Sequence, residues 1–396
     1  PRRKDTQLTH AGRNPRQQHG IVNPAVYHAS TVLFPTLDAL EQSHVRPFEG
    51  VSYGRYGTPT HFAFEQALCE LDGAHGAVTT SSGLAAIHIA LTAFLGQGDH
   101  VLVTDPVYGP TRKLCDGLLD KQGIQTTYYD PRIGSGIDGL MRPNTRVVYV
   151  ESPGSLTFEL QDVPAIAQAA HRHGAVVLMD NTWATPLFFP ALAQGVDVCV
   201  HAATKYLVGH ADAMLGVITC TEACYDAVKR TAVAVGNCAG PDDVYLGLRG
   251  LRTLGPRLRR HQQAALALCE WLRRQPEVER LLYPALPEHP DHALWRRDFS
   301  GASGLFGVVL EPCSRAALAA MLEGLQLFGM GYSWGGYESL ALPVPAESIR
   351  MQRTATNWPH AGPLLRLHAG LEDPQDLIDD LAAGFERFRK IKNGTG

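Results

Sequence analysis

The sequence predicts an α/β fold, in which a large domain with a mainly parallel sheet is followed by a smaller α+β domain. Between residues 58 and 250, strand-like segments alternate with segments of helical periodicity, and the strand-like segments are mostly continuous apolar runs. Such runs are typical of parallel strands that are covered on both faces. After about residue 250 the alternation ends. We therefore divide the chain into an N-terminal arm (1–57), a large domain (58–250) and a C-terminal domain (251–396).

The large domain is predicted to open with two helices, over 62–71 and over 83–95, and the second of them is strongly apolar. Ligands of parallel sheets bind beyond the carboxyl ends of the strands, so the residues directly after each strand are candidates for a functional site. The predicted strands are 100–104, 125–129, 146–150, 176–179, 196–200 and 214–220, with a further helix at 163–172.

The C-terminal domain is predicted to begin with a long helix over 257–274, which ends before a proline. Two short strands (306–310 and 364–368) and a helix over 315–324 follow. The last predicted helix covers 375–390, and a proline directly before it fits a helix start.

The N-terminal arm shows weak periodicity and is rich in Pro, Gly, Gln, Arg and His. This composition favours an extended segment over a packed core. Because a long arm usually packs on something, we expect this one to contact a neighbouring subunit.

The composition excludes several classes of protein. The 396 residues are 45% hydrophobic and 19% charged, with a net charge of −4 and no block of like charges, so no nucleic acid or anionic membrane is an expected partner. No apolar run approaches the ~20 residues of a membrane-spanning helix, and no signal-like segment opens the chain, so we expect a cytoplasmic location. The eight cysteines are scattered, which favours reduced thiols. Cys220 and Cys224 lack a second pair at metal spacing, so no metal site is expected.

Lys205 and Asp180 are the most informative residues. Lys205 follows the apolar run 196–200 closely, in a segment with little other charge, and Asp180 ends another apolar run. A lysine can form a Schiff base with pyridoxal phosphate (PLP), and an aspartate can keep the pyridinium nitrogen protonated so that the ring acts as an electron sink. The alternative is a solvated surface lysine, which is the ordinary position for this residue type.

Residues 79–86 lead from a strand into the apolar helix and offer an anion site. Gly83 and its neighbours leave backbone N–H groups at the helix start, where the helix dipole also favours a phosphate. Thr204, beside Lys205, could add a hydroxyl donor. Ser82 can cap the helix with or without a ligand, so a plain capped N-terminus is the alternative.

Four further residues offer suitable chemistry. Tyr108 follows a predicted strand, where its ring could stack on a pyridine or its phenol could move a proton; a structural turn is the alternative. Tyr53 and Arg55 suit a phosphate, or they belong to a surface turn. Arg366 lies within an apolar strand and needs an anionic partner, which is either a substrate α-carboxylate or an internal acid.

Together these motifs resemble the Cys/Met-metabolism family of PLP enzymes over nearly the whole chain. The segments that carry the resemblance are SYGRYGTPTHFAFE, TSSGLAAI, DPVYGPT, VESPGS, LMDNTWATP, HAATKYLVGHAD, SWGGYESL and LLRLHAGLED. The resemblance implies a PLP-dependent transferase-like fold of the aspartate aminotransferase type (fold type I). It also implies PLP as the cofactor, an amino-acid substrate, and a homotetramer built as a dimer of active dimers.

The resemblance further implies a role for each matching residue. Lys205 would hold PLP and then move the Cα proton, Asp180 would pair with the pyridinium nitrogen, and Tyr108 would stack on the ring. Gly83, the backbone of Leu84 and Thr204 would bind the phosphate of PLP. Tyr53 and Arg55 would reach the cofactor phosphate and the substrate of a neighbouring subunit. Arg366, Ser333 and Trp334 would bind the substrate.

Within this family, three features are similar to the β-lyase branch: Trp183 after the aspartate, Trp334, and Ser155 where γ-type members have an asparagine. The branch implies a carbon–sulfur lyase of methionine biosynthesis, which converts L-cystathionine to homocysteine, pyruvate and ammonia by α,β-elimination. Side activity on cystine and S-substituted cysteines is also implied. The alternatives are a γ-lyase or γ-synthase of the same family and, more remotely, a non-catalytic scaffold.

Two features of the sequence depart from the family pattern. Ala202 replaces a serine that binds phosphate in many members, so one donor is missing. Arg112 and Lys113 occupy a stretch where some β-lyases place an acidic residue for the distal amine of cystathionine. The preference among cystathionine, cystine and other S-substituted cysteines is therefore left open by the sequence.

Overall fold

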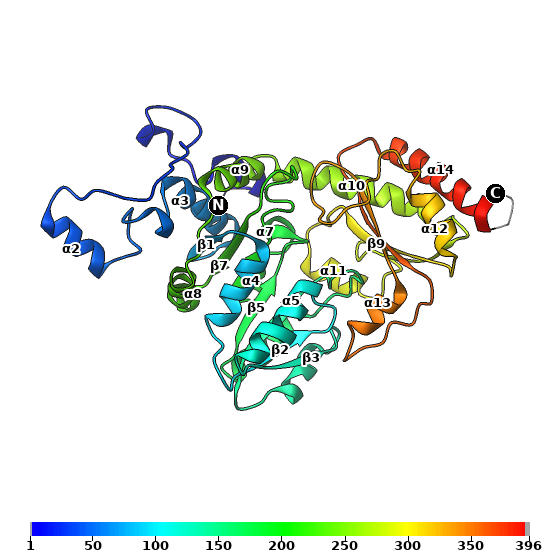
Figure 1. Cartoon of the computed structure of the whole chain (residues 1–396), viewed down its shortest axis with the longest axis horizontal. Helices are drawn as coiled ribbons and strands as arrows, with labels where there is room; N and C mark the ends of the chain where they lie inside the picture. Colours follow the sequence, from blue (N-terminus) through cyan, green and yellow to red (C-terminus); the bar gives the residue numbers. More distant parts are fainter. Residues whose placement is uncertain (1, 393–396) are drawn as a thin grey trace.

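The computed structural model describes residues 2–392 and arranges the chain along one long axis (Figure 1). The arm lies at the left end, the large sheet in the middle, and the smaller sheet with the C-terminus at the right. Helix α10 (Leu254–Leu272) runs from the middle of the molecule to the right-hand part and so links the two sheets. No described helix is long and apolar enough to cross a membrane.

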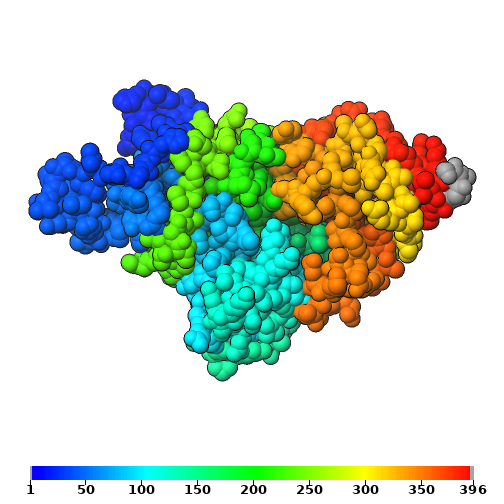
Figure 2. Space-filling view, in the orientation of Figure 1, coloured from blue at the N-terminus to red at the C-terminus, as the bar shows by residue number. Residues whose placement is uncertain are grey.

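The beginning of the arm is packed on the body of the protein, whereas the sequence predicts an extended segment. Helix α1 (Lys4–His10) contacts α3 (Pro59–Asp72) and α10, and Leu8 and Ala11 are buried there. A helix of about two turns is too short for its apolar face to appear as a periodic pattern. Much of the rest of the arm projects from the body (Figure 2), including η1 (Pro15–Gln17) and α2 (Leu37–Val45). η2 (Gly54–Tyr56) lies against the body again, where Arg55 donates to the carbonyl oxygen of Val233.

The large sheet has seven strands in the order β1-β7-β6-β5-β4-β2-β3. β7 is antiparallel to both of its neighbours, and the remaining pairs are parallel, which confirms the mainly parallel sheet. The strands are β1 (Gly76–Thr80), β2 (His100–Thr104), β3 (Gln125–Tyr129), β4 (Thr145–Glu151), β5 (Val176–Asp180), β6 (Val198–His201) and β7 (Gly216–Cys220).

Both faces of the large sheet are covered by helices. α3 and α6 (Val163–Arg172) contact one face, and α4 (Gly83–Thr92) and α8 (Glu222–Ala234) contact the other. Because side chains alternate along a strand, Val148 and Tyr149 belong to different cores. The shorter elements of this part are α5 (Gly109–Lys113), its π-helical continuation η3 (Leu114–Leu119), η4 (Gly134–Leu140), α7 (Thr185–Phe188), η5 (Ala191–Gln194) and α9 (Pro241–Leu251).

The smaller sheet has four antiparallel strands in the order β10-β11-β9-β8. α12 (Arg315–Leu322) and α14 (Pro374–Lys392) pack on each other, and α14 also contacts α10. The remaining elements are β8 (Val278–Leu282), α11 (His292–Asp298), β9 (Leu305–Leu310), β10 (Leu340–Val344), α13 (Ala346–Met351) and β11 (Leu364–His368).

The predicted segments lie within a few residues of those observed. The strands predicted at 100–104, 125–129 and 364–368 coincide with β2, β3 and β11, whereas the helix predicted over 83–95 ends at Thr92. The sequence did not predict β8 or β10, because β8 carries exposed charged residues and β10 contains Pro343. The divisions at 57/58 and 250/251 remain predictions.

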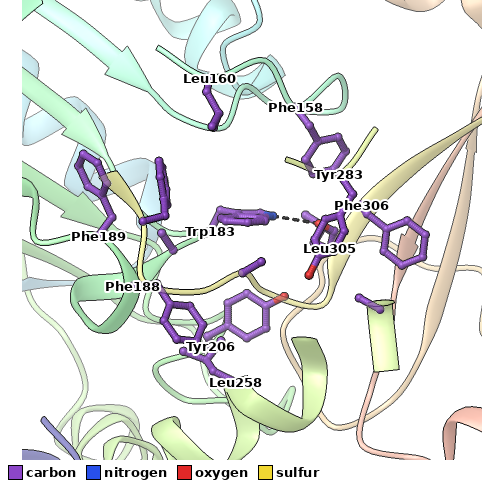
Figure 3. Close-up of a cluster of buried hydrophobic side chains, with 14 of the residues drawn as sticks. Phe158, Leu160, Trp183, Phe188, Phe189, Tyr206, Leu258, Tyr283, Leu305 and Phe306 are labelled. Carbon is purple, nitrogen blue, oxygen red and sulfur yellow. Dashed lines mark hydrogen bonds between the residues drawn. The ribbon is translucent and has the colours of Figure 1, made fainter. Parts of the chain in front are cut away.

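A cluster of aromatic side chains joins the two sheets (Figure 3). Trp183 follows β5, is buried, and donates a hydrogen bond from Nε1 to the carbonyl oxygen of Leu305 at 2.9 Å. Its ring packs edge-on against Tyr283 and Phe299. The carboxyl ends of the central strands of the large sheet are thereby held against the smaller sheet.

Candidate active site

A cavity of about 470 Å³ lies where the large sheet meets the smaller one. Its volume suits a small-molecule ligand. It is lined by residues from both parts of the chain, and nine of the residues predicted from the sequence are among them: Gly83, Leu84, Tyr108, Asp180, Thr204, Lys205, Ser333, Trp334 and Arg366.

Lys205 lies in the turn that follows β6, with its ammonium group inside the cavity wall. Its Nζ donates to the hydroxyl of Ser333 at 2.6 Å and lies 5.5 Å from the ring centre of Trp334. Burial, reinforced by the positive charge of Arg366 and opposed by Asp180, lowers the pKa of Lys205 to about 8. An amine with this pKa can lose its proton near neutral pH, as a nucleophilic or basic lysine must.

Arg366 points into the same cavity from β11 and has no carboxylate partner within ion-pair distance among residues 2–392. Its Nη2 donates to the carbonyl oxygen of Ser333 at 2.9 Å. Burial lowers its pKa to about 10, which means that the pocket disfavours a lone positive charge. The sequence allows two partners for Arg366, an internal acid or a substrate carboxylate. The internal acid is wrong, so the expected partner is an anionic group of a ligand.

Ser333 contacts both Lys205 and Arg366, and its backbone is strained. Its φ is 79°, a left-handed conformation that costs energy for a residue with a side chain. The nearby Gly335 also has a positive φ, and a Cβ there would lie 3.0 Å from the carbonyl carbon of Lys205. The loop can therefore approach the lysine this closely only because position 335 is glycine.

Asp180 ends β5 and faces the cavity. One of its carboxylate oxygens accepts a hydrogen bond from the backbone N–H of Thr182 at 2.9 Å. Burial is the main cause that raises the pKa of Asp180, while the hydrogen bonds from Thr182 and the charges of His201 and Lys205 oppose this rise. Such a carboxylate gains from pairing with a cationic group of a ligand.

Tyr108 directly precedes α5, lines the cavity and is 42% exposed. Burial of the hydroxyl, followed by the charges of Asp180 and Glu151, raises its pKa, so the phenol stays protonated at neutral pH. A partly exposed ring over a cavity that contains Lys205 and Asp180 is free to stack on a flat ligand.

The start of α4 forms the other wall. Ser82 caps the helix by accepting a hydrogen bond from the N–H of Ala85 at 3.2 Å, and the N–H groups of Gly83 and Leu84 lie too early in the helix to have intrahelical acceptors. A Cβ on Gly83 would lie 2.5 Å from the Cβ of Ala202, so only glycine allows this approach. The result is an anion-binding helix end beside the segment that carries the lysine.

Thr204 lines the cavity but is already engaged with the backbone. Its hydroxyl accepts from the N–H of Leu215 at 2.9 Å and lies 3.2 Å from the carbonyl oxygen of the same residue. It can donate to a phosphate only by turning its proton away from that carbonyl. Ala202 offers no hydroxyl, so the backbone of α4 carries more of any phosphate site.

Tyr53 and Arg55 do not line the cavity. Arg55 donates to the carbonyl oxygen of Val233 at 2.7 Å and lies over the ring of Tyr56, beside a separate small hollow. Tyr53 is 43% exposed. Their predicted role in a neighbouring subunit stays a prediction.

The basic residues near Tyr108 differ in their surroundings. Arg112 is buried, donates to the carboxylate of Asp105 at 2.8 Å and lies over the ring of Tyr128 at 3.5 Å. It is therefore unable to contact a ligand. Lys113 is exposed and does not line the cavity.

Sequence reasoning missed two polar residues of the site. Thr182 accepts from the N–H of Ala202 at 2.8 Å, which ties the loop after β5 to the segment before Lys205. Glu151 ends β4, lines the cavity and accepts from the N–H of Tyr108 at 2.8 Å. Its position directly after an apolar strand is the same signal that identified Asp180.

The residues present fit PLP. One cavity is surrounded by an amine with a lowered pKa, a carboxylate at a strand end, a stackable ring and a helix N-terminus with free N–H groups. These are the groups that PLP requires for covalent attachment, ring protonation, stacking and phosphate binding. Arg366 is left over for an acidic group of a substrate.

One group of potential metal ligands lies outside the cavity. Asp72, Cys199 and His201 are buried, and their ligand atoms lie within 4.8 Å of one another. Burial raises the pKa of the Cys199 thiol well above its ordinary value, so it stays protonated and is a poor metal ligand. A structural zinc needs four ligands, and this group offers three. Asp72 also accepts a hydrogen bond from Thr219 at 2.5 Å, so we interpret the group as a hydrogen-bonded part of the core.

Comparisons with known proteins give a consistent result. The family model described as Cys/Met metabolism PLP-dependent enzyme matches residues 5–386. A putative cystathionine beta-lyase from Rhizobium johnstonii is 49% identical over 385 residues, which cover 96% of this chain and 95% of the relative. Cystathionine beta-lyase MetC from Escherichia coli is 45% identical, with 97% and 98% covered. A solved structure of cystathionine gamma synthase from Xanthomonas oryzae pv. oryzae superposes with a TM-score of 0.90 at 32% identity, covering 98% of this chain and 99% of that one.

Proposed function

The chain belongs to the Cys/Met metabolism PLP-dependent enzyme family, and on this basis we propose that it is a cystathionine β-lyase. It cleaves the Cβ–S bond of L-cystathionine to give homocysteine, pyruvate and ammonia, with side activity on cystine and other S-substituted cysteines. The observation that carries the proposal is the 49% and 45% identity, over nearly the whole chain, to relatives named as cystathionine beta-lyases.

PLP supplies the electron sink that stabilises negative charge at Cα of the substrate. Lys205 would hold PLP through its side-chain amine, and the free amine would remove the Cα proton of the substrate. Its lowered pKa lets it act as a base near neutral pH, and the hydroxyl of Ser333, 2.6 Å from Nζ, keeps the amine directed into the cavity. Lys205 or Tyr108 then gives a proton to the departing thiolate.

Arg366 binds the α-carboxylate of the substrate. The guanidinium is held by the carbonyl oxygen of Ser333 and lacks an ion-pair partner within residues 2–392, so a carboxylate would compensate its buried charge. Because Ser333 contacts both Arg366 and Lys205, the same residue sets the distance between the carboxylate site and the base.

Trp334 restricts the space beside the base. Its ring lies 5.5 Å from Nζ of Lys205 and 5.4 Å from the ring of Tyr206. This wall suits a reaction that ends at Cβ, since γ-elimination requires the substrate chain to move so that a second proton is removed. The likeness to the γ-synthase structure favours the γ-type enzyme as the second candidate.

We also propose that the chain works in the cytoplasm as a homotetramer of two active dimers. Tyr53 and Arg55 lie outside the cavity of their own subunit, and Tyr53 is 43% exposed, which suits a role at the PLP phosphate and substrate of a neighbouring subunit. Sedimentation analysis tests the assembly. Arg55→Ala should weaken PLP binding in the assembled enzyme while leaving the fold of the single subunit intact.

The reaction is tested by incubating the PLP-loaded protein with L-cystathionine and identifying the products. Pyruvate with homocysteine supports cleavage at Cβ. The pair 2-oxobutyrate and cysteine would mean cleavage at Cγ, in which case the branch assignment is wrong and the γ-type alternative holds.

A further inference from the structure

Glu151 and Asp180 are two carboxylic acids at the edge of the large sheet. They end the neighbouring parallel strands β4 and β5 and are register partners. Register partners place their side chains on the same face of a sheet. Both residues line the cavity, so the site contains a second acid beside the one that pairs with the pyridinium nitrogen.

Two acids so placed do not both carry a charge at low cost. Around Glu151, β4 contributes Tyr149, the loop before α5 contributes Tyr108, and β5 contributes Asp180. The cations of the cavity, Lys205 and Arg366, are tied to Ser333. Burial, followed by the charge of Asp180, raises the pKa of Glu151 well above its ordinary value, and the hydrogen bond from Tyr108 only partly opposes this rise.

The hydrogen bond of Glu151 gives this acid a specific role. Its Oε2 accepts from the backbone N–H of Tyr108 at 2.8 Å. That N–H lies at the start of α5, where the following N–H groups of Thr111 and Arg112 already bond to the carbonyl oxygen of Tyr108. Since Tyr108 is 42% exposed, packing alone does not fix its ring, and the backbone anchor determines where the ring stands.

We propose that Glu151 is a positioning residue that acts as a neutral carboxylic acid, fixing the stacking ring of Tyr108 and leaving Asp180 as the single anion at the pyridinium nitrogen. The proposal rests on the proposed function only through the PLP site and is independent of which carbon–sulfur bond is cleaved. It predicts that an amide, which is also neutral and keeps an acceptor oxygen, can replace the acid.

The test compares Glu151→Gln with Glu151→Ala, with the exposed Glu323→Gln as the control for a change of overall charge. PLP affinity is measured from the visible absorbance of the lysine-bound cofactor. We expect Glu151→Gln to stay within about twofold of the unmodified protein and Glu151→Ala to lose about tenfold, the order of one aromatic stacking contact, because the ring of Tyr108 is then no longer fixed. A glutamine variant as weak as the alanine variant would overturn the proposal.

A double-mutant cycle separates positioning from general damage. If Glu151 acts through Tyr108, the loss of PLP affinity caused by Glu151→Ala should nearly vanish in a Tyr108→Ala background. Equal losses in both backgrounds would sink the proposal.

The protonation of Glu151 is tested directly by infrared difference spectroscopy, and this measurement needs only the glutamine variant to fold. A carboxylic-acid carbonyl band at neutral pH should be present in the unmodified protein and absent from Glu151→Gln. If only carboxylate bands change, Glu151 is charged and the proposal is wrong. Failure of the unmodified protein to bind PLP, by contrast, would refute the proposed function.

Discussion

Gly83→Ala tests whether the start of α4 must lie as close to the lysine segment as the structure places it. A Cβ at this position would lie 2.5 Å from the Cβ and 2.9 Å from the Cα of Ala202. Carbon atoms pack at about 3.5–4.0 Å, so the two segments must separate by about 1 Å. Ala202 is not free to retreat, because its N–H donates to the hydroxyl of Thr182 at 2.8 Å.

The cost of this clash should appear mainly in PLP binding. Overpacking of this kind typically costs about 1–3 kcal/mol, which corresponds to about 5- to 150-fold in an equilibrium constant. We expect the PLP dissociation constant of Gly83→Ala, measured by absorbance titration, to rise within that range. The control is Gly117→Ala, where nothing lies within 4 Å of the added methyl group. If Gly83→Ala binds PLP as tightly as the control and unfolds at the same temperature, the close approach has no role in the phosphate site.

Four further predictions follow from the same geometry. Lys205→Ala should reduce turnover by at least about 10⁴-fold and abolish the visible absorbance of the bound cofactor; residual turnover above that level would show that another group is the base. Arg366→Lys should raise KM by about 10- to 150-fold with a smaller change in kcat, because a bidentate, charge-assisted contact is lost; steady-state kinetics decide this. In the PLP-free protein, the pKa of Lys205 is about 8 against an ordinary 10.5, so the neutral amine should accumulate as the pH rises through about 8. The folded state should gain stability between pH 8 and 10.5, because the unfolded lysine still binds its proton there. The rate of chemical labelling of Lys205 against pH measures the midpoint, and a midpoint near 10.5 contradicts the lowered pKa. Arg112→Met should lower the free energy of unfolding by about 3 kcal/mol, because Asp105 stays buried without its cation. The ratio of activity on cystathionine to activity on cystine should stay unchanged. A change in that ratio would mean that Arg112 contacts the substrate.

The sequence was sufficient for the parts of the fold that depend on local pattern. Parallel strands buried on both faces appear as apolar runs, so β2 could be predicted along with the position of Asp180 at the end of β5. Elements without such a pattern were missed. The apolar side of α1 is visible only when Leu8 is seen in the core, and Pro343 conceals β10 because a proline usually argues against a strand.

Contacts between distant segments could not be predicted from the sequence. The alternatives for Arg366, an internal acid or a substrate carboxylate, were equal until its neighbours in space were known, because pairing is decided by tertiary structure. The same holds for Arg112, which stands in a stretch where some β-lyases place an acidic residue for the substrate and which the structure pairs with Asp105. A charged residue in an apolar segment indicates that it has a partner of opposite charge, but it does not indicate whether that partner is a side chain or a ligand.

Glu151 shows why strand ends need a register before they can be assigned chemistry. Glu151 and Asp180 both follow apolar runs, and either could have been chosen as the partner of the pyridinium nitrogen. A shift of one residue between β4 and β5 would turn one of the two side chains to the opposite face of the sheet, where it would enter the other core. The observed register puts both on the cavity side, and the N–H of Tyr108 then distinguishes them, because it engages Glu151 and leaves Asp180 facing the cavity. The two acids therefore differ in function through their neighbours and not through their own chemistry, and only the alignment of β4 with β5 makes that difference visible.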